Sequence, residues 1–519
     1  MTASAAKAEH GLIVQAFSVL FSLCVLFVVW PLEATRYLPI EDLPQHLAAI
    51  RVLHSFDDAS FGFQQYFVLA LRQTQYLGYY LLADGLAYFV DLERANHFLV
   101  VLTAAAIPYA LLYLLDALNR DRVLALFALP LTYNAHLILG FINFLMAISA
   151  ALVGLGLVVH QCRSTTRGRA LALGLTATFC FFCHVVPFAF LVLGAFLLCV
   201  QLSVRRTAYI LSPLLPALLV GAAWMAQSPA GQATLSAAAG GDTGLRAVYQ
   251  PADVALRDLP NWLTDVFHGP AGLRQLEYFG ALLSVTLLLG LMRGLYMQSW
   301  RSRAGEQSLW APGSFVRLVP LVPLAAAAYF VLPSGYAWIW PIAQRFPLMC
   351  LLLLVPVLPK PPRVVLAVIV VGLLWLSATQ QRAASSAFAA FEQEEVGAFD
   401  QALAAIPNGQ RVMGLIYARG SKQVKFSPFI HFVAFYQARK GGAVMFTFAD
   451  FPQSPFRFRE DARPPRVPPR WEWMPERVRP ADIGWYDYVL VRGGAGDPCR
   501  GACELRFRQG FWSVWKRRV

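Results

Sequence analysis

The chain has 519 residues and a formal net charge of +13; 57% of its residues are hydrophobic and only 14% are charged. One soluble core cannot bury so much apolar surface, so the composition excludes an ordinary soluble protein and indicates a membrane protein. The positive charge does not by itself indicate nucleic acid, because the distribution of charge along the chain matters more than its total. The apolar runs end near Ser377, which predicts a transmembrane domain of residues 1–380 and a soluble domain of residues 381–519.

The first apolar run, Gly11 to Leu32, follows Lys7 and has the length of a bilayer span, so it predicts a retained signal-anchor helix. The later runs that predict helices are Phe98–Leu118, Val123–Leu139, Phe141–Val159, Ala170–Leu202, Ala208–Met225, Tyr278–Leu295, Phe315–Leu332, Phe346–Leu358 and Val364–Ser377. Ala170–Leu202 would overshoot a bilayer core of roughly 30 Å, so we expect it to turn near His184 and Pro187 into two short helices. The sequence thus predicts an α-helical polytopic membrane protein with about eleven spans.

The basic residues predict which side of the membrane each connection faces. We treat the short segment Tyr79–Val90 as re-entrant or interfacial, because Asp84 and Gly85 interrupt it. Arginine and lysine then occur in every second connection, at Arg120, Arg122, Arg163, Arg167, Arg169, Arg205, Arg206, Arg301, Arg303, Lys360 and Arg363. The positive-inside bias places these connections and the N-terminus in the cytoplasm. The long loops 31–97 and 226–277 and the C-terminal domain then face the other side.

The sequence Pro39-Ile-Glu-Asp-Leu-Pro-Gln-His-Leu places two carboxylates and a histidine just beyond the first span. Pro44 suits the first turn of a helix, and Asp42 would lie near the positive N-terminal end of that helix. One interpretation is a helix cap followed by a solvated histidine, His46. The other is a catalytic site at the mouth of a cavity, where Glu41, Asp42 and His46 provide a general base or Asp42 and His46 bind a divalent metal ion.

Further polar residues fall at the same outer depth on this topology: His136, Asn143 and His184. Polar groups at membrane depth usually face a bundle interior or a wet cavity, although each of these residues also suits an interhelical hydrogen bond. Arg345 opens a helix at the outer edge, against the positive-inside bias. It either snorkels to the interface or binds the phosphate of a lipid or lipid-linked substrate.

The second outer loop contains Asp265 and His268 among apolar residues, and both are candidates for substrate binding. Cys499 and Cys503 fall in the soluble domain, where they form either a disulfide or two free thiols. Cys180-Phe-Phe-Cys-His184 matches the pattern for covalent haem attachment, but its Phe- and Leu-rich surroundings argue against haem. No motif for a phosphate-binding glycine loop or a zinc-binding cysteine quartet occurs, so a divalent cation is the one cofactor left open.

The region after the last span alternates helix and strand patterns, which predicts a small α/β domain. Its expected helices are Ala384–Ile406 and Phe429–Arg439. Its expected strands are Arg411–Tyr417, Ala443–Phe448, Tyr486–Val491 and Phe511–Lys516. The segment Phe451–Pro480 between them is rich in proline, arginine and aromatic residues, which suits anionic headgroups or a phosphorylated glycan, or else a solvated loop packed on the bundle.

With its acidic first outer loop, many helices, outer arginine and non-cytoplasmic C-terminal domain, the chain resembles GT-C-type membrane glycosyltransferases. The residues that carry the resemblance are Asp42-x-Pro44-x-His46-Leu47, Gly140-Phe141-Ile-Asn143-Phe144 and Arg345-Phe346, which also look like poorly characterised bacterial proteins grouped near that superfamily. Glu41-Asp42 departs from the separated acidic pair of many members.

The resemblance implies transfer of a sugar from a polyprenyl-phosphate donor to a glycan or lipid acceptor. Asp42 would act as the base, Arg345 would face the phosphate, and His46 would support the site or bind a metal ion. The abundance of Ala, Arg, Gly and Pro suggests a GC-rich bacterium, so we expect the inner membrane, with the C-terminal domain in the periplasm. The alternatives are a lipid or glycan transporter and a non-enzymatic component of envelope assembly.

Overall fold

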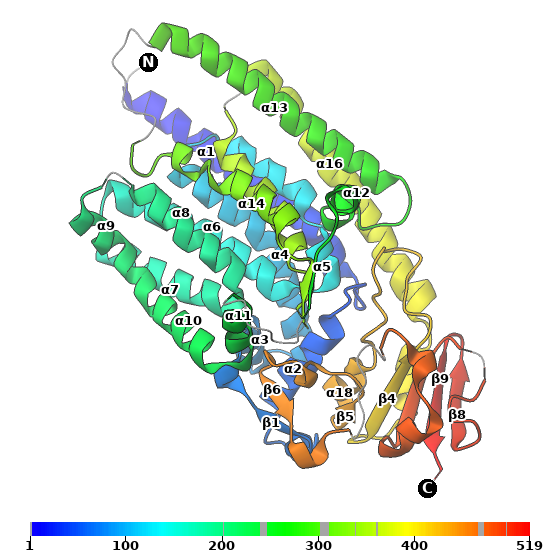
Figure 1. Ribbon diagram of the computed structural model, residues 1–519. Coiled ribbons are helices and arrows are strands. Elements are labelled where there is room, and N and C mark those ends of the chain that lie inside the picture. The colour runs from blue at the N-terminus through cyan, green and yellow to red at the C-terminus, as the bar shows by residue number, and fades with distance from the viewer. Residues whose placement is uncertain are drawn as a thin grey trace.

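The computed structural model describes residues 3–200, 202–238, 246–301, 311–337, 339–359, 362–464, 472–494 and 496–518. Most of these residues are helical, and a helix bundle lies beside a small β-sheet near the C-terminus (Figure 1). Within the described ranges, the helical segments long and apolar enough to cross a membrane are Val14–Ala34, Leu92–Ala117, Ile142–Arg163, Val204–Gln227, Ala271–Met292 and Arg363–Val396. The structure therefore confirms the prediction of a mostly helical chain with several apolar helices and a small C-terminal sheet, and six of its helical segments are candidate spans by length and composition.

The bundle helices follow the apolar runs of the sequence. They are α1 (Ala3–Ala34), α4 (Leu92–Ala117), α6 (Ile142–Arg163), α7 (Arg167–Cys183), α8 (Val185–Cys199), α9 (Val204–Leu211), α10 (Leu215–Gln227), α13 (Ala271–Arg301), α14 (Leu321–Val331), α15 (Phe346–Leu354) and α16 (Arg363–Ala390). The α4 helix begins where the Asp91 carboxylate accepts hydrogen bonds from the amides of Glu93 and Arg94, at 2.9 and 3.2 Å. Helices α7 and α8 meet at His184, which confirms the predicted turn within Ala170–Leu202.

The segment Val123–Leu139, expected to be one helix, is divided. It forms a 3-10 helix, η3 (Arg122–Leu131), and a short helix, α5 (Ala135–Leu139). Pro130 has no amide proton to donate, and the Asn134 side chain accepts from the amides of His136 and Leu137 at 2.9 and 3.2 Å, so it caps α5 instead of continuing a helix. The division matters because α5 and the turn at Gly140 reach the candidate site.

Shorter elements fill the long loops and connections. The helices and strands are α2 (Leu43–His54), α3 (Gly78–Ala87), α11 (Pro229–Ala238), α12 (Ala252–Trp262), β1 (Phe67–Leu69), β2 (Ala247–Val248) and β3 (Gly335–Tyr336). The 3-10 helices are η1 (Phe63–Gln65), η2 (Leu71–Gln73), η4 (Ser212–Leu214), η5 (Phe315–Leu318), η6 (Ala343–Arg345), η7 (Val355–Val357), η9 (Phe448–Asp450), η10 (Glu460–Ala462), η11 (Pro475–Arg477) and η12 (Pro480–Trp485). Helix α3 has only 10 residues, fewer than a bilayer crossing requires.

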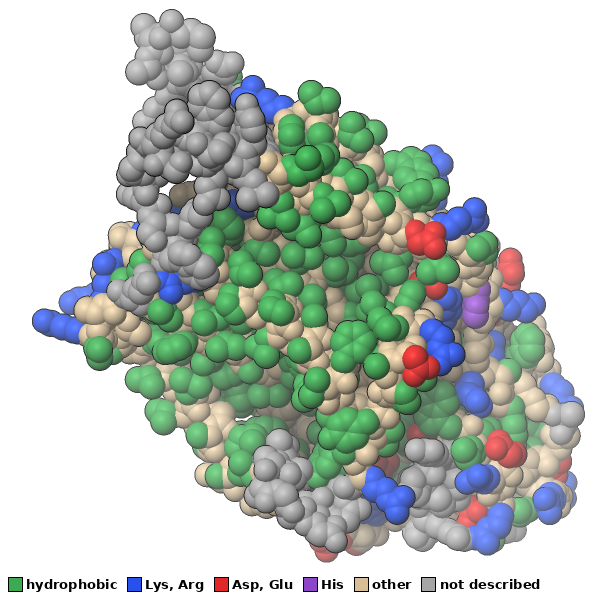
Figure 2. Space-filling view, turned by 45° about the horizontal axis from the view of Figure 1, so that its top comes forward, with side chains coloured by type: hydrophobic (Ala, Val, Ile, Leu, Met, Phe, Trp, Pro, Cys, Tyr) green, Lys and Arg blue, Asp and Glu red, His purple; other side chains and the backbone are tan. Residues whose placement is uncertain are grey.

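Most of the bundle surface visible in Figure 2 is a broad field of hydrophobic side chains, with charged side chains at its edges. Several arginine-containing connections meet at the end of the bundle away from the sheet. Arg206 donates from Nη2 to the carbonyl of Cys162 at 2.6 Å, and the amide of Gly313 donates to the carbonyl of Leu198 at 3.0 Å. Arg303 and Lys360, which the charge pattern also includes, lie outside the described residues.

The C-terminal domain contains a five-stranded sheet in the order β5-β4-β7-β9-β8. The strands are β4 (Arg411–Ile416), β5 (Ala443–Val444), β7 (Tyr488–Arg492), β8 (Cys503–Gln509) and β9 (Trp512–Arg517). β4 pairs in parallel with β5 and β7, whereas β9 is antiparallel to β7 and β8. The predicted α/β alternation is therefore present, although β5 is shorter than expected and β8 was not predicted.

The helices of this domain differ from the prediction in their bounds. Helix α16 continues without interruption through Gln380 and is followed by a π-helical turn, η8 (Phe391–Val396), and by α17 (Phe399–Ala404). The predicted boundary thus falls inside a helix. The helix expected at Phe429–Arg439 begins later, as α18 (Ala434–Lys440).

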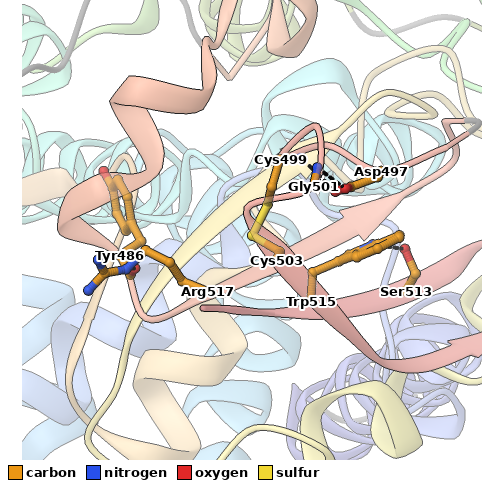
Figure 3. Close-up of a disulfide and its surroundings, with 8 residues drawn as sticks. All are labelled: Tyr486, Asp497, Cys499, Gly501, Cys503, Ser513, Trp515 and Arg517. Atoms are coloured by element: carbon orange, nitrogen blue, oxygen red, sulfur yellow. Dashed lines mark hydrogen bonds between the residues drawn. A yellow bond between two sulfur atoms is a disulfide. The ribbon is translucent and has the colours of Figure 1, made fainter. Parts of the chain in front are cut away.

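Cys499 and Cys503 form a disulfide before β8, so the disulfide alternative is the correct one (Figure 3). The Asp497 carboxylate accepts hydrogen bonds from the amides of Cys499 and Gly501 in the same turn. The disulfide packs into a second apolar core together with Tyr486 and Trp515.

The first outer loop and the C-terminal domain interlock. Strand β1 pairs antiparallel with β6 (Phe456–Phe458), and helix α2 packs against α18. Arg439 donates from Nε to Glu93 at 2.6 Å and from Nη1 to Asp400 at 2.9 Å. Loop 31–97 and the C-terminal domain therefore lie at the same end of the bundle, as the predicted topology requires.

Candidate functional site

A cavity of about 760 Å³ lies where the end of the bundle meets the C-terminal domain. Six of the predicted site residues line it: Glu41, Asp42, His46, Asn143, His184 and Arg345. The residues that sequence reasoning missed are Tyr76, Tyr80, Arg419, His431 and Glu472. Three of these belong to the C-terminal domain, and no spacing pattern relates them to Asp42 because they are nearly 400 positions away in the chain.

The backbone at Glu41 and Asp42 is fixed by the turn after α5. The amide of Glu41 donates to the carbonyl of Ile138 at 2.9 Å, and the amide of Asp42 donates to the carbonyl of Leu139 at 3.1 Å. Gly140 has a φ of +90°, and a Cβ built there would lie 2.9 Å from Cβ of Asp42. A glycine is needed at this position for both its backbone angle and its close approach to Asp42.

Asp42 immediately precedes α2, but its side chain makes no capping hydrogen bond. Its Oδ1 lies 3.0 Å from Nδ1 of His431 instead. Asp42 is thus the N-cap residue of α2 by position, as one interpretation expected, but its carboxylate does not cap the helix; Pro44 lies in the first turn of α2 as predicted. The carboxylate is available to the cavity and is only partly buried, with 19% of the side chain exposed.

His46 is buried and both of its ring nitrogens have protein partners. Nε2 lies 2.8 Å from the carbonyl oxygen of Gly140, and Nδ1 lies 2.9 Å from the hydroxyl of Tyr80. Because a carbonyl only accepts, Nε2 carries the proton and Nδ1 accepts from Tyr80. Burial lowers the pKa of His46 and favours this neutral form.

The structure thus corrects two predictions for His46: it is not solvated, and neither nitrogen is free to bind a metal ion. Within the described part of the chain, no group of three or more His, Cys, Asp or Glu side chains is arranged to hold a metal ion. His46 instead ties α2 to the Gly140 turn and so supports the backbone that carries Asp42.

Glu41 is almost fully buried, and its Oε2 accepts a hydrogen bond from the amide of Ser427 at 2.9 Å. Burial, followed by the neighbouring Asp42 carboxylate, raises the pKa of Glu41 to about 7. Burial alone would lower the pKa of His431, but the carboxylates of Asp42, Glu41 and Glu472 outweigh burial and raise it. This end of the cavity therefore pairs acidic groups with one histidine.

Arg345 lines the cavity from the bundle side. It is 8% exposed, so it does not snorkel to the surface, and its guanidinium lies 5.5 and 5.9 Å from the ring centres of Phe141 and Phe144. Its Nε has no hydrogen-bond partner, and in the described part of the chain Arg345 forms no ion pair with a carboxylate. A buried cation without a counter-charge is costly, which makes this position favourable for an anion.

Two other predicted residues line the same wall. The Asn143 side chain accepts a hydrogen bond from the amide of Tyr79 at 3.3 Å, which holds the start of α3. His184 Nδ1 accepts from the amide of Val186 at 3.1 Å, while Nε2 has no partner in the described structure. Asn143 therefore has a structural contact, whereas His184 presents an unpaired nitrogen beside the anion-favouring position.

Aromatic side chains cover much of the cavity wall: Tyr76, Tyr80, Phe141, Phe144, Trp340, Phe446, Phe448, Phe451 and Trp473. The Arg419 guanidinium lies 5.5 Å from the ring centre of Trp473. Flat apolar rings with charged groups at separate positions suit a ligand that has both apolar faces and polar groups, such as a sugar.

Three predicted site residues do not line the cavity. His136 is buried behind its wall, with its ring centre 4.9 Å from that of Phe144. Asp265 forms an ion pair of 2.5 Å with Lys425, and the amide of His268 donates to the carbonyl of Gln423 at 3.1 Å. Asp265 and His268 thus join the second outer loop to the C-terminal domain.

The cavity therefore brings a carboxylate–histidine pair and a buried guanidinium into one space. Compared with known proteins, the chain matches no family model and no curated protein.

Proposed function

We propose that the protein is a GT-C-like membrane glycosyltransferase that moves a sugar from a polyprenyl-phosphate donor to an acceptor hydroxyl in the cell envelope. One observation carries the proposal: the Asp42 carboxylate and the Arg345 guanidinium line the same cavity. A base and a separate cation are the two groups that glycosyl transfer from a phosphate requires.

In this reaction the acceptor oxygen bonds to the anomeric carbon of the sugar, and the bond from that carbon to the phosphate oxygen breaks. The electron pair of the broken bond leaves with the polyprenyl phosphate, where Arg345 offsets the developing charge. Asp42 receives the proton of the acceptor hydroxyl. The aromatic residues of the wall pack against the sugar ring.

The proposal includes an orientation in the membrane. We place eleven crossings in the bundle, with η3 and α5 together forming one of them and α3 lying in the interface. The connections rich in arginine would face the cytoplasm, which follows the positive-inside bias. The cavity and the C-terminal domain would then face the periplasm of a bacterial inner membrane.

The position of the cavity favours a transferase over a lipid or glycan transporter. Transporter sites typically lie near the bilayer midplane between repeated halves. This cavity lies at the end of the bundle and takes part of its wall from the C-terminal domain. That arrangement suits a donor whose lipid stays in the membrane while its sugar reaches a polar acceptor.

The proposal is tested with the full chain in proteoliposomes, using polyprenyl-phosphate-linked hexoses and pentoses labelled in the sugar. Release of polyprenyl phosphate measures transfer to added glycan acceptors or to water. We expect the wild type to cleave at least one donor and Asp42→Asn to cleave it about 10²- to 10⁴-fold more slowly, because a general base contributes that much.

The matched control is Asp84→Asn. Asp84 belongs to the same outer loop and also contacts a histidine, His54, but it does not line the cavity. We expect this control to retain transfer. Full activity of Asp42→Asn would exclude Asp42 as the base, and a wild type inactive with every donor would contradict the glycosyltransferase proposal.

A further inference from the structure

His431 enters the cavity from the C-terminal domain, in the segment between β4 and α18. It is 7% exposed, and its ring stacks on Phe446 with an interplanar angle of 16° and a centroid distance of 5.2 Å. Its Nδ1 lies 3.0 Å from Oδ1 of Asp42. The two side chains come from segments that are far apart in sequence and meet only in the folded molecule.

We propose that His431 is a positioning residue of the transfer site, which holds the Asp42 carboxylate in place. The inference rests on the proposed function, since it assigns His431 a part in the reaction that Asp42 performs. It also makes the catalytic centre composite, because the base comes from the first outer loop and its partner comes from the C-terminal domain.

The surroundings of Asp42 show why such a partner is needed. Its neighbour Glu41 accepts a hydrogen bond from the amide of Ser427, and the Asp42 side chain makes no capping hydrogen bond to α2. The ionisable groups that act on His431 are Asp42, Glu41 and Glu472, and His46 is the other histidine of this cluster. An imidazole at 3.0 Å, whose pKa the nearby carboxylates raise, gives the Asp42 carboxylate a charge-assisted contact that fixes its orientation.

The surroundings of His431 are rigid enough to fix a rotamer. The next residue, Phe432, stacks on Trp512 of β9 with ring centres 6.0 Å apart. Val433 packs so closely on β4 that a Cβ built at Gly414 would lie 2.8 Å from Cβ of Val433. The sheet therefore sets the position of His431, and His431 sets the position of Asp42, which makes no capping hydrogen bond of its own.

A second histidine–aspartate pair, His54–Asp84 in the first outer loop, provides a matched control. Nδ1 of His54 lies 2.9 Å from Asp84 Oδ1, almost the same separation as in the His431–Asp42 pair, but neither residue lines the cavity. The first experiment compares His431→Gln with His54→Gln in the proteoliposome assay across a range of pH, with a polyprenyl-phosphate-linked sugar that the wild type cleaves.

We expect His431→Gln to lower kcat by roughly tenfold to a hundredfold with little change in KM for the donor. The pH profile should also change, because the titration of His431 that contributes to it in the wild type is absent from the variant. His54→Gln should match the wild type in both respects. Equal losses in the two variants, or a loss in His431→Gln with an unchanged profile, would overturn the inference.

A second experiment does not depend on activity. The full chain is labelled with ¹³C at histidine Cε1, and the resonance missing from His431→Gln is titrated in the wild type and in Asp42→Asn. We expect the pKa of His431 to lie above the ordinary histidine value in the wild type and to be lower in Asp42→Asn, which removes the contacting carboxylate. The same pKa in both proteins would overturn the pair. A wild type inactive with all donors would contradict the transferase proposal alone, because this titration decides the pair by itself.

Discussion

Glu41 and Asp42 are adjacent carboxylic acids, but their side chains lie in different surroundings. Glu41 is buried and accepts a hydrogen bond from Ser427, whereas Asp42 is partly exposed to the cavity and lies beside His431. Two carboxylates placed in unlike surroundings are commonly divided between a neutral and a charged role. Burial raises the pKa of Glu41 to about 7, so Glu41 is the member that holds a proton just below neutral pH.

Glu41 gives a prediction about pH and stability. The pKa of Glu41 is raised to about 7 in the folded protein, whereas in the unfolded chain it is near 4.3. The folded state therefore binds this proton more tightly, and the stabilisation is complete below about pH 4 and is lost as the pH rises through about 7. Glu41→Gln is always neutral. Between about pH 5 and about pH 8 the free energy of unfolding of the wild type should therefore fall by on the order of 2 kcal/mol relative to that of this variant.

The measurement is the thermal midpoint of the detergent-solubilised protein as a function of pH. His431 contributes a loss in the same direction in both proteins, and the Glu41 carboxylate adds to the raised pKa of His431 in the wild type, so the difference between the curves reports Glu41 together with its effect on His431. Glu460→Gln, at an exposed position of the C-terminal domain, serves as the control and should follow the wild type. Parallel curves for the wild type and Glu41→Gln would show that Glu41 has an ordinary pKa.

From the sequence, the bundle residues that line the cavity were predicted more accurately than the roles of those residues. The motif around Asp42, the turn at Gly140, His184 and Arg345 share one cavity, and the topology that follows from the charge pattern already assigns them a common depth. Asp42 takes the N-cap position that the motif predicts, but its side chain makes no capping hydrogen bond, and His46 is buried instead of solvated. Hydrogen-bond partners cannot be identified from spacing. His431 was missed because a long-range contact with a separate domain leaves no local pattern.

At the level of helices and strands, apolar runs predicted where helices occur but not whether a run forms one helix. The runs Phe98–Leu118, Phe141–Val159 and Val364–Ser377 correspond to α4, α6 and α16, but Val123–Leu139 became two short elements. Hydropathy averages over a window and does not register Pro130 or Asn134, each of which changes the backbone locally. Strand β8 was missed because Glu504, Arg506 and Arg508 alternate along it, so that it lacks the apolar run expected of a buried strand.

The hairpin β8–β9 gives a prediction at this scale. Cys499 and Cys503 are separated by 4 positions, and closing so short a loop is worth about 2 kcal/mol on the loop-entropy estimate. The double variant Cys499→Ala/Cys503→Ala should keep the bundle intact but loosen the turn before β8. Amide hydrogen exchange of residues 497–509 should be faster in the variant, with α6 unchanged.

Reducing agent provides the control for the disulfide. It should speed exchange in the wild type to the level of the double variant and have no effect on the variant. Identical exchange in the oxidised wild type and the variant would mean that the apolar core around Tyr486 and Trp515 holds the turn without the disulfide.

The two ends of the molecule are built from different connections. Arginine-containing connections meet at one end of the bundle, and the cavity, the long loops and the C-terminal domain lie at the other. The sequence predicted this division because the positive-inside bias acts over the whole chain and needs no detail of packing. It could not predict the interlocking of loop 31–97 with the C-terminal domain, which depends on contacts such as β1–β6.

Labelling in intact cells tests which end faces the cytoplasm. Arg167→Cys places a thiol on the arginine-rich end, and Glu504→Cys places one on the C-terminal sheet; both positions are exposed. With a membrane-impermeant maleimide, we expect Glu504→Cys to react in intact cells and Arg167→Cys to react only after lysis. The wild type, whose free cysteines are buried or half-buried, provides the background. Labelling of Arg167→Cys before lysis would reverse the proposed orientation.

The pairing of β1 with β6 also constrains when the protein becomes functional during its synthesis. Phe67 pairs with Phe458, and the hydrogen bond from Ser427 to Glu41 joins residues 386 positions apart. Loop 31–97 leaves the ribosome early, yet its partners are made only when most of the chain has been translated. A chain that stops before His431 would contain every bundle helix and the Asp42 motif but would lack a closed cavity. Until those partners have been made, an unfinished chain in the membrane therefore lacks the closed cavity on which the proposed function depends.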